Sequence, residues 1–254
     1  MTRNEDKTTR KTTETSLTIL EAINDLEDAT LSTLSDYTGL ATSTVHTHLE
    51  TLERAEYVIQ TGNTYHLGFK IFHLGENARY RDDRYRLARQ TVSELADRMS
   101  EEVNFSVEEY GRSIVLFEAS SSHREEFQVG LYFNMHSSAS GKAMLAEYDD
   151  DRVMEIIEEW GLTKHTSHSI TDSEALFDEL STVRKQGYAV NRQEQIEGMR
   201  AVAIAVTEPD ESVFGTLDIS GPSYRLPDDG ELAEQIRPFV YRLEEKLAQY
   251  ELCW

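Results

Sequence analysis

A group of polar side chains in the N-terminal third of the chain could contact a nucleic acid. Ser43, Thr44 and Thr47 carry hydroxyls and His46 carries an imidazole, and their spacing places them opposite the apolar face of a predicted helix. Such groups hydrogen-bond to base edges or phosphates, and a threonine methyl can contact the methyl of thymine. The spacing therefore predicts that Ser43, Thr44, His46 and Thr47 contact DNA, whereas His48 falls on the packing side.

The segments around this helix have the pattern of a winged helix-turn-helix. The apolar spacing predicts a first helix over 16–26, a second helix ends at Gly39, and a third begins after Ala41. Two short strands then flank a turn that contains Gly62, which is typical of a hairpin wing. Spacing, helix breaker and wing agree, so this part of the chain is predicted to be a DNA-binding domain.

The remaining sequence predicts a linker and a second domain. The helix after the wing ends in the charged stretch RYRDDRYR, which has no core pattern. Strands are predicted at 103–110 and 113–119 around a Gly111-Arg112 turn, with a third at 126–133. Strands mixed with helices indicate an α+β fold in which helices pack on an antiparallel sheet. The predicted organisation is a flexible tail or minor-groove arm (1–15), a winged helix-turn-helix domain (16–68), a linker helix (69–86) and an effector-binding domain (87–254).

Charge is unevenly distributed along the chain. The formal net charge is −22, and residues 1–90 hold 11 Lys and Arg against 14 Asp and Glu, whereas residues 91–254 hold 14 against 33. No Lys or Arg lies between Lys11 and Arg54, the interval that contains the predicted DNA-reading helix. This composition is typical of proteins from organisms that keep molar salt in the cytoplasm; an acidic protein from a mesophile is the alternative.

Molar salt would change how such a domain binds DNA. The Debye length falls to about 3 Å at 1 M salt, so basic side chains would add little affinity through counterion release. Base-edge hydrogen bonds, methyl contacts and shape would then carry more of the binding. The missing cations are therefore compatible with DNA recognition.

The segment HSSASGKA predicts a small-molecule site. Ser137 or Ser138 fits the N-cap of a helix, which would leave the amides of Ala139, Ser140 and Gly141 free. Free amides and the helix dipole favour a carboxylate. The alternative is an ordinary capped helix in which Gly141 is needed for packing.

The segment NRQEQIEGMR is a second candidate. Arg192 and Arg200 could face an organic acid, or Glu194 and Glu197 could neutralise them in surface pairs. Asp218 alternates with apolar neighbours on a predicted strand, so its side chain faces either a pocket or solvent.

Five segments in order resemble the IclR-type transcriptional regulators: TSLTILEAI, TGLATSTVHTHLETL, HSSASGKAMLA, QGYAVNRQEQIEGMRAVAIAV and DISGPSYRL. The resemblance extends from about Ser16 to Tyr250 and, with the acidity, indicates a haloarchaeal source. It implies a winged helix-turn-helix, a linker helix and a C-terminal domain similar to the GAF fold. It also implies a homodimer or homotetramer that binds double-stranded operator DNA and a small-molecule effector, an organic acid, a sugar or an aromatic metabolite.

The resemblance also implies a set of pocket residues. Carried over position by position, these are Phe133, Ala139, Ser140, Asn191, Met199, Ala201, Asp218 and Ser220. Met199 and Ala201 would form an apolar floor, and the polar members would orient the ligand. Family members carry acidic residues where Asn191 and Arg192 stand, so this chain departs from the pattern there.

Other kinds of site are not expected. The lone Cys253 cannot form a disulfide within the chain, and His165, His168 and Asp172 lack a supporting ligand pattern, so neither a metal nor a cofactor is predicted. No apolar run is long enough to span a membrane and the N-terminus does not resemble a signal peptide, which predicts a cytoplasmic protein.

Two other functional classes remain open at this point. A protein-interaction or dimerisation module would leave no sequence-specific footprint on DNA, and an enzyme would need titratable groups that converge in a cleft. The sequence favours a regulator without catalytic residues.

Overall fold

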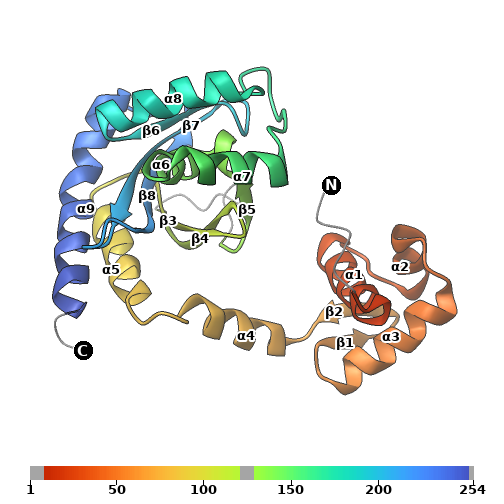
Figure 1. Ribbon diagram of the computed structural model, residues 1–254. Coiled ribbons are helices and arrows are strands. Elements are labelled where there is room, and N and C mark those ends of the chain that lie inside the picture. Colours follow the sequence, from red (N-terminus) through yellow and green to blue (C-terminus); the bar gives the residue numbers. More distant parts are fainter. Residues whose placement is uncertain (1–8, 121–128, 252–254) are drawn as a thin grey trace. The chain divides into compact units, whose positions relative to one another are not determined.

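The computed structural model describes residues 9–120 and 129–251, and the chain divides into two compact units between Arg81 and Asp82 (Figure 1). The N-terminal unit consists of α1 (Lys11–Asp25), α2 (Leu31–Thr38), α3 (Thr42–Arg54), β1 (Val58–Thr61), β2 (Thr64–Leu67) and α4 (Phe69–Arg79). The C-terminal unit holds the remaining elements. The two units are described separately.

The first three helices and the β1–β2 hairpin share one hydrophobic core, as the winged helix-turn-helix pattern predicts. Ile19, Leu34 and Leu49 contribute one fully buried side chain from each helix, and Tyr65 is buried from β2. Gly39 ends α2 in the left-handed conformation, with φ 69°, a geometry that glycine adopts without strain.

Helix α1 begins at Lys11, five residues before the predicted start at Ser16. The Thr15 hydroxyl donates to the Lys11 carbonyl oxygen at 2.8 Å, and the Ser16 hydroxyl donates to that of Thr12. The side chains of this first turn are mostly exposed, so apolar spacing gave no signal for it. The predicted tail over 1–15 was therefore too long at its C-terminal end.

The C-terminal unit is a six-stranded antiparallel sheet with helices on both faces (Figure 1). Its strand order is β5-β4-β3-β8-β7-β6, and the predicted α+β class is confirmed. Its elements are α5 (Tyr85–Ala96), β3 (Glu102–Glu109), β4 (Arg112–Ala119), β5 (Tyr132–Asn134), the 3-10 turn η1 (Met135–Ser137), α6 (Ala139–Glu147), α7 (Asp150–Trp160), α8 (Ser173–Gln186), β6 (Ala189–Arg192), β7 (Met199–Thr207), β8 (Val213–Pro222) and α9 (Asp229–Glu251).

The predicted turn between the first two strands and the predicted start of the third strand were wrong. The β3–β4 turn consists of Tyr110 and Gly111, with φ 53° and 72°, the two positive values of a type I′ hairpin. Arg112 consequently begins β4, and its guanidinium lies over the Tyr132 and Trp160 rings, 4.1 and 4.4 Å from their centroids. Strand β5 begins only at Tyr132, and positions 126–128 of the predicted strand lie outside the described residues.

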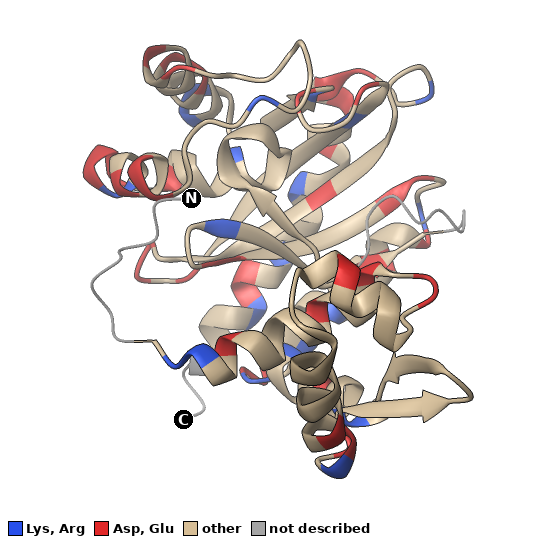
Figure 2. Ribbon diagram, turned by 90° about the vertical axis from the view of Figure 1, so that its right-hand side faces the viewer, with Lys and Arg blue, Asp and Glu red and all other residues tan. Residues whose placement is uncertain are grey.

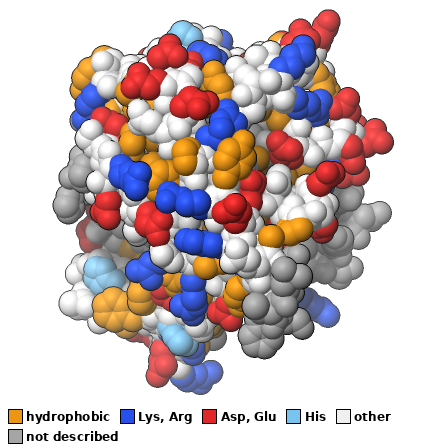
Figure 3. Space-filling view, turned by 90° about the vertical axis from the view of Figure 1, so that its left-hand side faces the viewer, with side chains coloured by type: hydrophobic (Ala, Val, Ile, Leu, Met, Phe, Trp, Pro, Cys, Tyr) orange, Lys and Arg blue, Asp and Glu red, His pale blue; other side chains and the backbone are white. Residues whose placement is uncertain are grey.

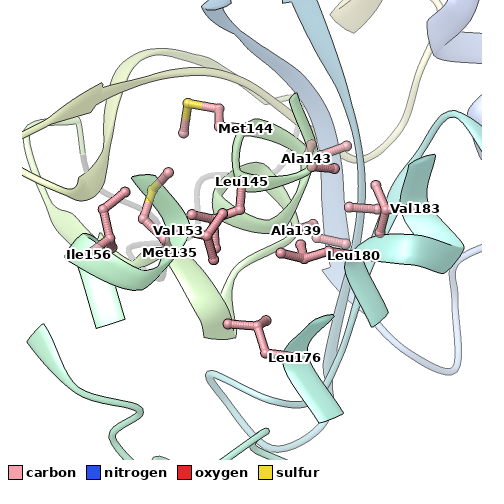
Figure 4. Packing of buried hydrophobic residues seen from close by; sticks show 14 residues of the cluster. Met135, Ala139, Ala143, Met144, Leu145, Val153, Ile156, Leu176, Leu180 and Val183 are labelled. Atoms are coloured by element: carbon pink, nitrogen blue, oxygen red, sulfur yellow. The ribbon is translucent and has the colours of Figure 1, made fainter. Parts of the chain in front are cut away.

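Successive side chains of β7 point to opposite faces of the sheet. Ala201 and Ala203 belong to the hydrophobic cluster formed with α6, α7 and α8 (Figure 4), and Val202 and Ile204 point to the opposite face. Because alanine side chains are short, α6 can lie close to the sheet. Met144 of α6, Leu180 of α8 and other large residues complete this buried cluster.

Gly141 allows α6 to pack closely against η1. A Cβ at this position would lie 2.3 Å from the carbonyl oxygen of Met135, a distance that no relaxed side chain tolerates. Gly141 is therefore required for packing, as the alternative interpretation of HSSASGKA held.

We predict that Gly141→Ala lowers the free energy of unfolding by about 1–3 kcal/mol, since backbone atoms must shift to admit the methyl group. Gly75→Ala is the matched control because Gly75 also lies within a helix, α4, but an added Cβ would meet no atom within 4 Å. That variant should gain about 0.5–1 kcal/mol from helix propensity. Denaturant unfolding measures both, and equal stability of Gly141→Ala and wild type would contradict the packing role.

Candidate functional site

A narrow cavity lies between the N-terminal end of α6 and the sheet. It encloses about 370 Å3 of space that is partly open to solvent, and only about one or two water molecules fit between its walls. All six strands of the sheet contribute to it. Its lining residues are Asn104, Ser106, Ser113, Val115, Phe133, Ser138, Ala139, Ser140, Asn191, Gln195, Ala201 and Asp218.

Six of the eight residues expected at a pocket line this cavity: Phe133, Ala139, Ser140, Asn191, Ala201 and Asp218. Met199 and Ser220 do not. Met199 pairs with Pro222 where β7 begins, beyond the cavity. Ser220 lies behind Asn104, whose side-chain amide donates to the Ser220 hydroxyl at 3.2 Å.

The sequence interpretation missed the polar wall that β3 and β4 supply. Asn104 and Ser106 alternate with Val103 and Phe105 on β3, and all four side chains are buried. A signal for this wall was present, because helices on both faces of the sheet should leave no polar face on a central strand. Polar residues at alternate positions of a covered strand indicate a cavity.

Asp218 is the central polar group of the cavity. One carboxylate oxygen accepts from the Ser140 hydroxyl at 2.8 Å, and the other accepts from the Asn104 amide nitrogen at 3.1 Å. Burial raises the pKa of Asp218 to about 6, against these two hydrogen bonds, and the nearby Glu118 adds to the rise. The structure thus turns Asp218 toward the cavity and not toward solvent.

Two buried polar atoms of the cavity have no protein partner within the described residues. They are Asn104 Oδ1 and Ser113 Oγ, on side chains that are each 1% exposed. The amide orientation of Asn104 is set by its donor bonds to Asp218 and Ser220, so the free atom is a carbonyl oxygen. An unsatisfied buried polar atom costs about 1–3 kcal/mol, which is a reason to expect a ligand or water at both.

Arg192 and Arg200 face away from the cavity. They pair with each other across β6 and β7, one position along from the pair Asn191 and Ala201, which lines the cavity. Arg192 forms an ion pair with Asp229 at 2.8 Å, and Arg200 lies 3.5 Å from the same carboxylate. The partner is therefore Asp229, at the start of α9, and neither Glu194 nor Glu197.

Lys142 is the buried cation of this region, and the sequence interpretation did not identify it. Its side chain on α6 is fully buried, and its ammonium lies 2.8 Å from both Glu179 of α8 and Glu194 of the loop after β6. Burial raises the pKa of Glu194, and the nearby Lys142 opposes the rise. A buried charge needs partners of this kind, so the Lys142 pairs tie that loop to α6.

The start of α6 offers fewer free amides than expected. Ser138 is the N-cap, and its hydroxyl accepts from the Gly141 amide at 3.0 Å. The Gly141 amide is thus already occupied, which corrects the expectation that it is free. The helix still places Ser138, Ala139 and Ser140 against the cavity.

The candidate DNA contacts lie on the first turns of α3. Ser43, His46 and Thr47 are exposed, and Thr44 is half-buried. The Thr47 hydroxyl donates to the Ser43 carbonyl oxygen at 2.9 Å, so its methyl group is the more available contact. His48 points inward, and its Nδ1 lies 2.8 Å from the Ser16 hydroxyl.

Other functional groups in the described residues have structural partners. Asp172 caps α8 by accepting from the Ala175 amide, and His165 stacks on His136. Within the described residues no three His, Cys, Asp or Glu side chains form a metal-binding group. In the same part of the chain, no helix combines the length and the hydropathy needed to cross a bilayer.

Comparison with known proteins identifies both units. Residues 81–243 match the family described as bacterial transcriptional regulator IclR C-terminal, and residues 13–62 match the IclR helix-turn-helix domain. The chain belongs to the IclR family of transcriptional regulators. The N-terminal unit therefore contains the DNA-binding helix-turn-helix domain of the IclR family.

Curated relatives in the IclR family extend over most of the chain. "Probable HTH-type transcriptional regulator ArcR" of Halobacterium salinarum is 32% identical over 87% of this chain and 86% of its own length. The HTH-type transcriptional regulator KdgR of Dickeya chrysanthemi is 31% identical over 83% of this chain and 70% of its own. The first relative is consistent with the haloarchaeal source that the acidity indicates.

Solved structures show the same IclR fold. The Thermotoga maritima IclR structure is 20% identical with a TM-score of 0.77, and it covers 93% of this chain and 98% of its own. The structure of an IclR transcriptional regulator from Alicyclobacillus acidocaldarius is 24% identical with a TM-score of 0.79, and it covers 96% of this chain and 99% of its own. At these identities the comparisons establish the fold of the chain.

We predict that Asp218→Asn stabilises the protein above pH 6. The folded state holds the Asp218 proton more tightly than the unfolded state, since the pKa rises from 3.8 to about 6. Stability from this group therefore falls as the pH rises through that interval and stays low above it. The amide can still accept from Asn104 and donate to Ser140, and two pKa units correspond to a gain of up to about 3 kcal/mol.

Denaturant unfolding between about pH 4 and pH 8 tests this prediction. The gain of Asp218→Asn should disappear toward the acidic end, where the wild-type carboxyl is neutral. Asp210→Asn is the control, because hydrogen bonds from Ser212 lower the pKa of this exposed carboxyl. That variant should gain no stability at neutral pH; a gain for Asp218→Asn that does not change with pH would contradict the assignment.

Proposed function

We propose that this regulator contacts operator DNA through α3 and that a small molecule in the cavity beside α6 controls the binding. The observation that carries the proposal is the polar cavity itself. Ser140, Asn104 and Asp218 form a buried hydrogen-bonded group that opens on the space, and two further polar atoms lack protein partners among the described residues. A hydrophobic core needs none of these groups, whereas an effector site does.

The α3 surface supports direct readout of bases. Ser43, Thr44, His46 and Thr47 occupy the N-terminal half of α3, which is the part of a recognition helix that reaches base edges in the major groove. Ala41 provides no side-chain cap at this helix end, so the first amides of α3 are left for a phosphate.

The acidic composition of the protein supports DNA binding at high salt without strong electrostatic attraction to the phosphates. Acidic side chains outnumber basic ones along the ribbon (Figure 2). On the face crossed by α9, basic and acidic side chains lie beside one another (Figure 3). Since no Lys or Arg lies between Lys11 and Arg54, the interval that contains α3, counterion release supplies little of the affinity for DNA, and a regulator of this kind would act in a salt-rich cytoplasm.

Helix α4 supports assembly into a homodimer. None of its eleven residues is buried, and Phe69 and Phe72, one turn apart, are 91% and 68% exposed. Soluble monomers rarely leave such apolar patches open. A second copy of the chain that packs on α4 would cover these rings and give the two α3 helices that a palindromic operator requires.

We predict that Thr44→Ala with Thr47→Ala lowers operator affinity about tenfold or more, since each lost base contact costs about 1–3 kcal/mol. Operator fragments selected from genomic DNA and a fluorescence binding assay in molar KCl provide the measurement. Fold and dimerisation should be unchanged, because Thr47 is exposed, Thr44 is half-buried and neither belongs to the hydrophobic core of this unit.

Thr51→Ala is the matched control for this experiment. Thr51 is on the same helix and its hydroxyl makes the same kind of bond, to the Thr47 carbonyl oxygen at 3.0 Å. It lies one turn farther from the N-terminal end, so its removal should leave affinity unchanged. Undiminished operator binding by the double variant would refute the α3 contacts. If the wild-type protein gives no sequence-specific footprint on DNA, a protein-interaction module is favoured instead.

We predict that Ser140→Trp abolishes the effector response and leaves operator binding intact, because the indole fills the cavity. Ala201→Leu narrows the same cavity from β7 and serves as a second variant if the first does not fold. A thermal-shift screen of organic acids, sugars and aromatic metabolites at high potassium identifies compounds that stabilise wild type. These compounds should not stabilise either variant; an undiminished shift would place the effector elsewhere.

A further inference from the structure

The charge of the cavity restricts the kind of molecule that it can hold. Among the described residues that line the cavity, Asp218 is the one with an ionisable side chain, and the others are neutral polar or apolar. Because its pKa is about 6, this carboxyl is mostly ionised at neutral pH. A ligand therefore meets a negative charge at the sheet side of the cavity.

The nearby cations cannot compensate that charge. Lys142 is held between Glu179 and Glu194, so its charge is already balanced within the protein. Arg192 and Arg200 lie on the opposite face of the sheet, beside Asp229. Among the described residues, the start of α6 is the remaining positive element beside the cavity, and it supplies a partial charge of only about one half.

The hydrogen-bonding atoms of the cavity favour a donor on the ligand. Asn104 Oδ1 is a carbonyl oxygen without a partner in the described residues, and it can only accept. Ser113 Oγ also has no partner in the described residues, and it can accept or donate a hydrogen bond. A carboxylate has no donor for Asn104 and would repel Asp218, whereas a hydroxyl can donate to the amide oxygen and accept from the serine.

We propose that the effector is an uncharged hydroxylated compound, a sugar or a polyol, that widens the narrow cavity on binding and has a hydroxyl that donates to Asn104 Oδ1 and pairs with Ser113 Oγ. This inference rests on the proposed function, in which the cavity beside α6 is the effector site. It replaces the preference for an organic acid that free amides at the start of α6 suggested, since the Gly141 amide already donates to Ser138 and a carboxylate would face Asp218.

Matched pairs of ligands test the proposal. Each pair joins a neutral compound to its oxidised acid: glycerol with glycerate, D-glucose with D-gluconate, and D-galactose with D-galactonate. Calorimetry on the full-length protein in molar KCl at about pH 7.5, where Asp218 is mostly ionised, measures the dissociation constants. Wild type should bind at least one neutral member about tenfold or more tightly than its acid.

Two variants assign the selectivity to named atoms. Ser113→Ala removes an atom that bonds to no described residue, so the fold should keep its stability while affinity for the neutral ligand falls about five- to tenfold. Asp218→Asn removes the negative charge and should reduce or invert the preference over the acid. Ser223→Ala is the control, since its hydroxyl donates to the Gly198 carbonyl oxygen outside the cavity and both affinities should remain.

The outcomes separate this proposal from the proposed function. Tighter binding of acids, if Ser140→Trp abolishes it, would leave the cavity as the effector site but overturn the neutral class. Failure of every neutral compound to bind, or unchanged neutral-ligand affinity in Ser113→Ala, would also overturn it. If a neutral ligand binds with the expected sensitivity yet leaves operator affinity unchanged, the ligand class stands and its regulatory role fails.

Discussion

The close packing of α6 on the sheet is the constraint on which the C-terminal unit depends. Alanines of β7 allow this approach, and the missing side chain of Gly141 lets η1 pack against the same helix. It brings the Ser140 hydroxyl to 2.8 Å from Asp218 and removes Lys142 from solvent. The buried ammonium then requires carboxylates from α8 and from the loop after β6, so the same packing also fixes the walls of the cavity.

The cavity keeps polar groups at a cost to stability. Burial disfavours the ionised form of Asp218, which lowers the stability of the folded protein at neutral pH. In addition, Asn104 Oδ1 and Ser113 Oγ are buried without partners in the described residues. Such groups reduce stability unless a ligand satisfies them. Binding of a small molecule would therefore stabilise the wall formed by α6, β3, β4 and β8, which gives the effector a physical means to select one conformation of the unit.

The N-terminal unit has kept the shape of a DNA reader without its usual charge. The helix-turn-helix core depends on apolar residues such as Leu34 and Leu49, which salt does not screen, and the outward face of α3 carries hydroxyls instead of cations. Screening at molar salt weakens the attraction between basic side chains and DNA phosphates, but it leaves hydrogen bonds and methyl contacts effective. Fold and reading face can thus persist while the surface becomes acidic.

The sequence by itself determined the elements and the family, because apolar periodicity, caps and glycine breaks are local signals. Gly39 and the position of α6 were both readable in this way. Only the tertiary structure decided which side chains meet. A shift of one residue along β6 and β7 sends Asn191 into the cavity and Arg192 to Asp229, and the partners of Asp218 and Lys142 come from strands and helices distant in sequence. Periodicity gives the two faces of a strand, but what covers each face depends on packing between elements.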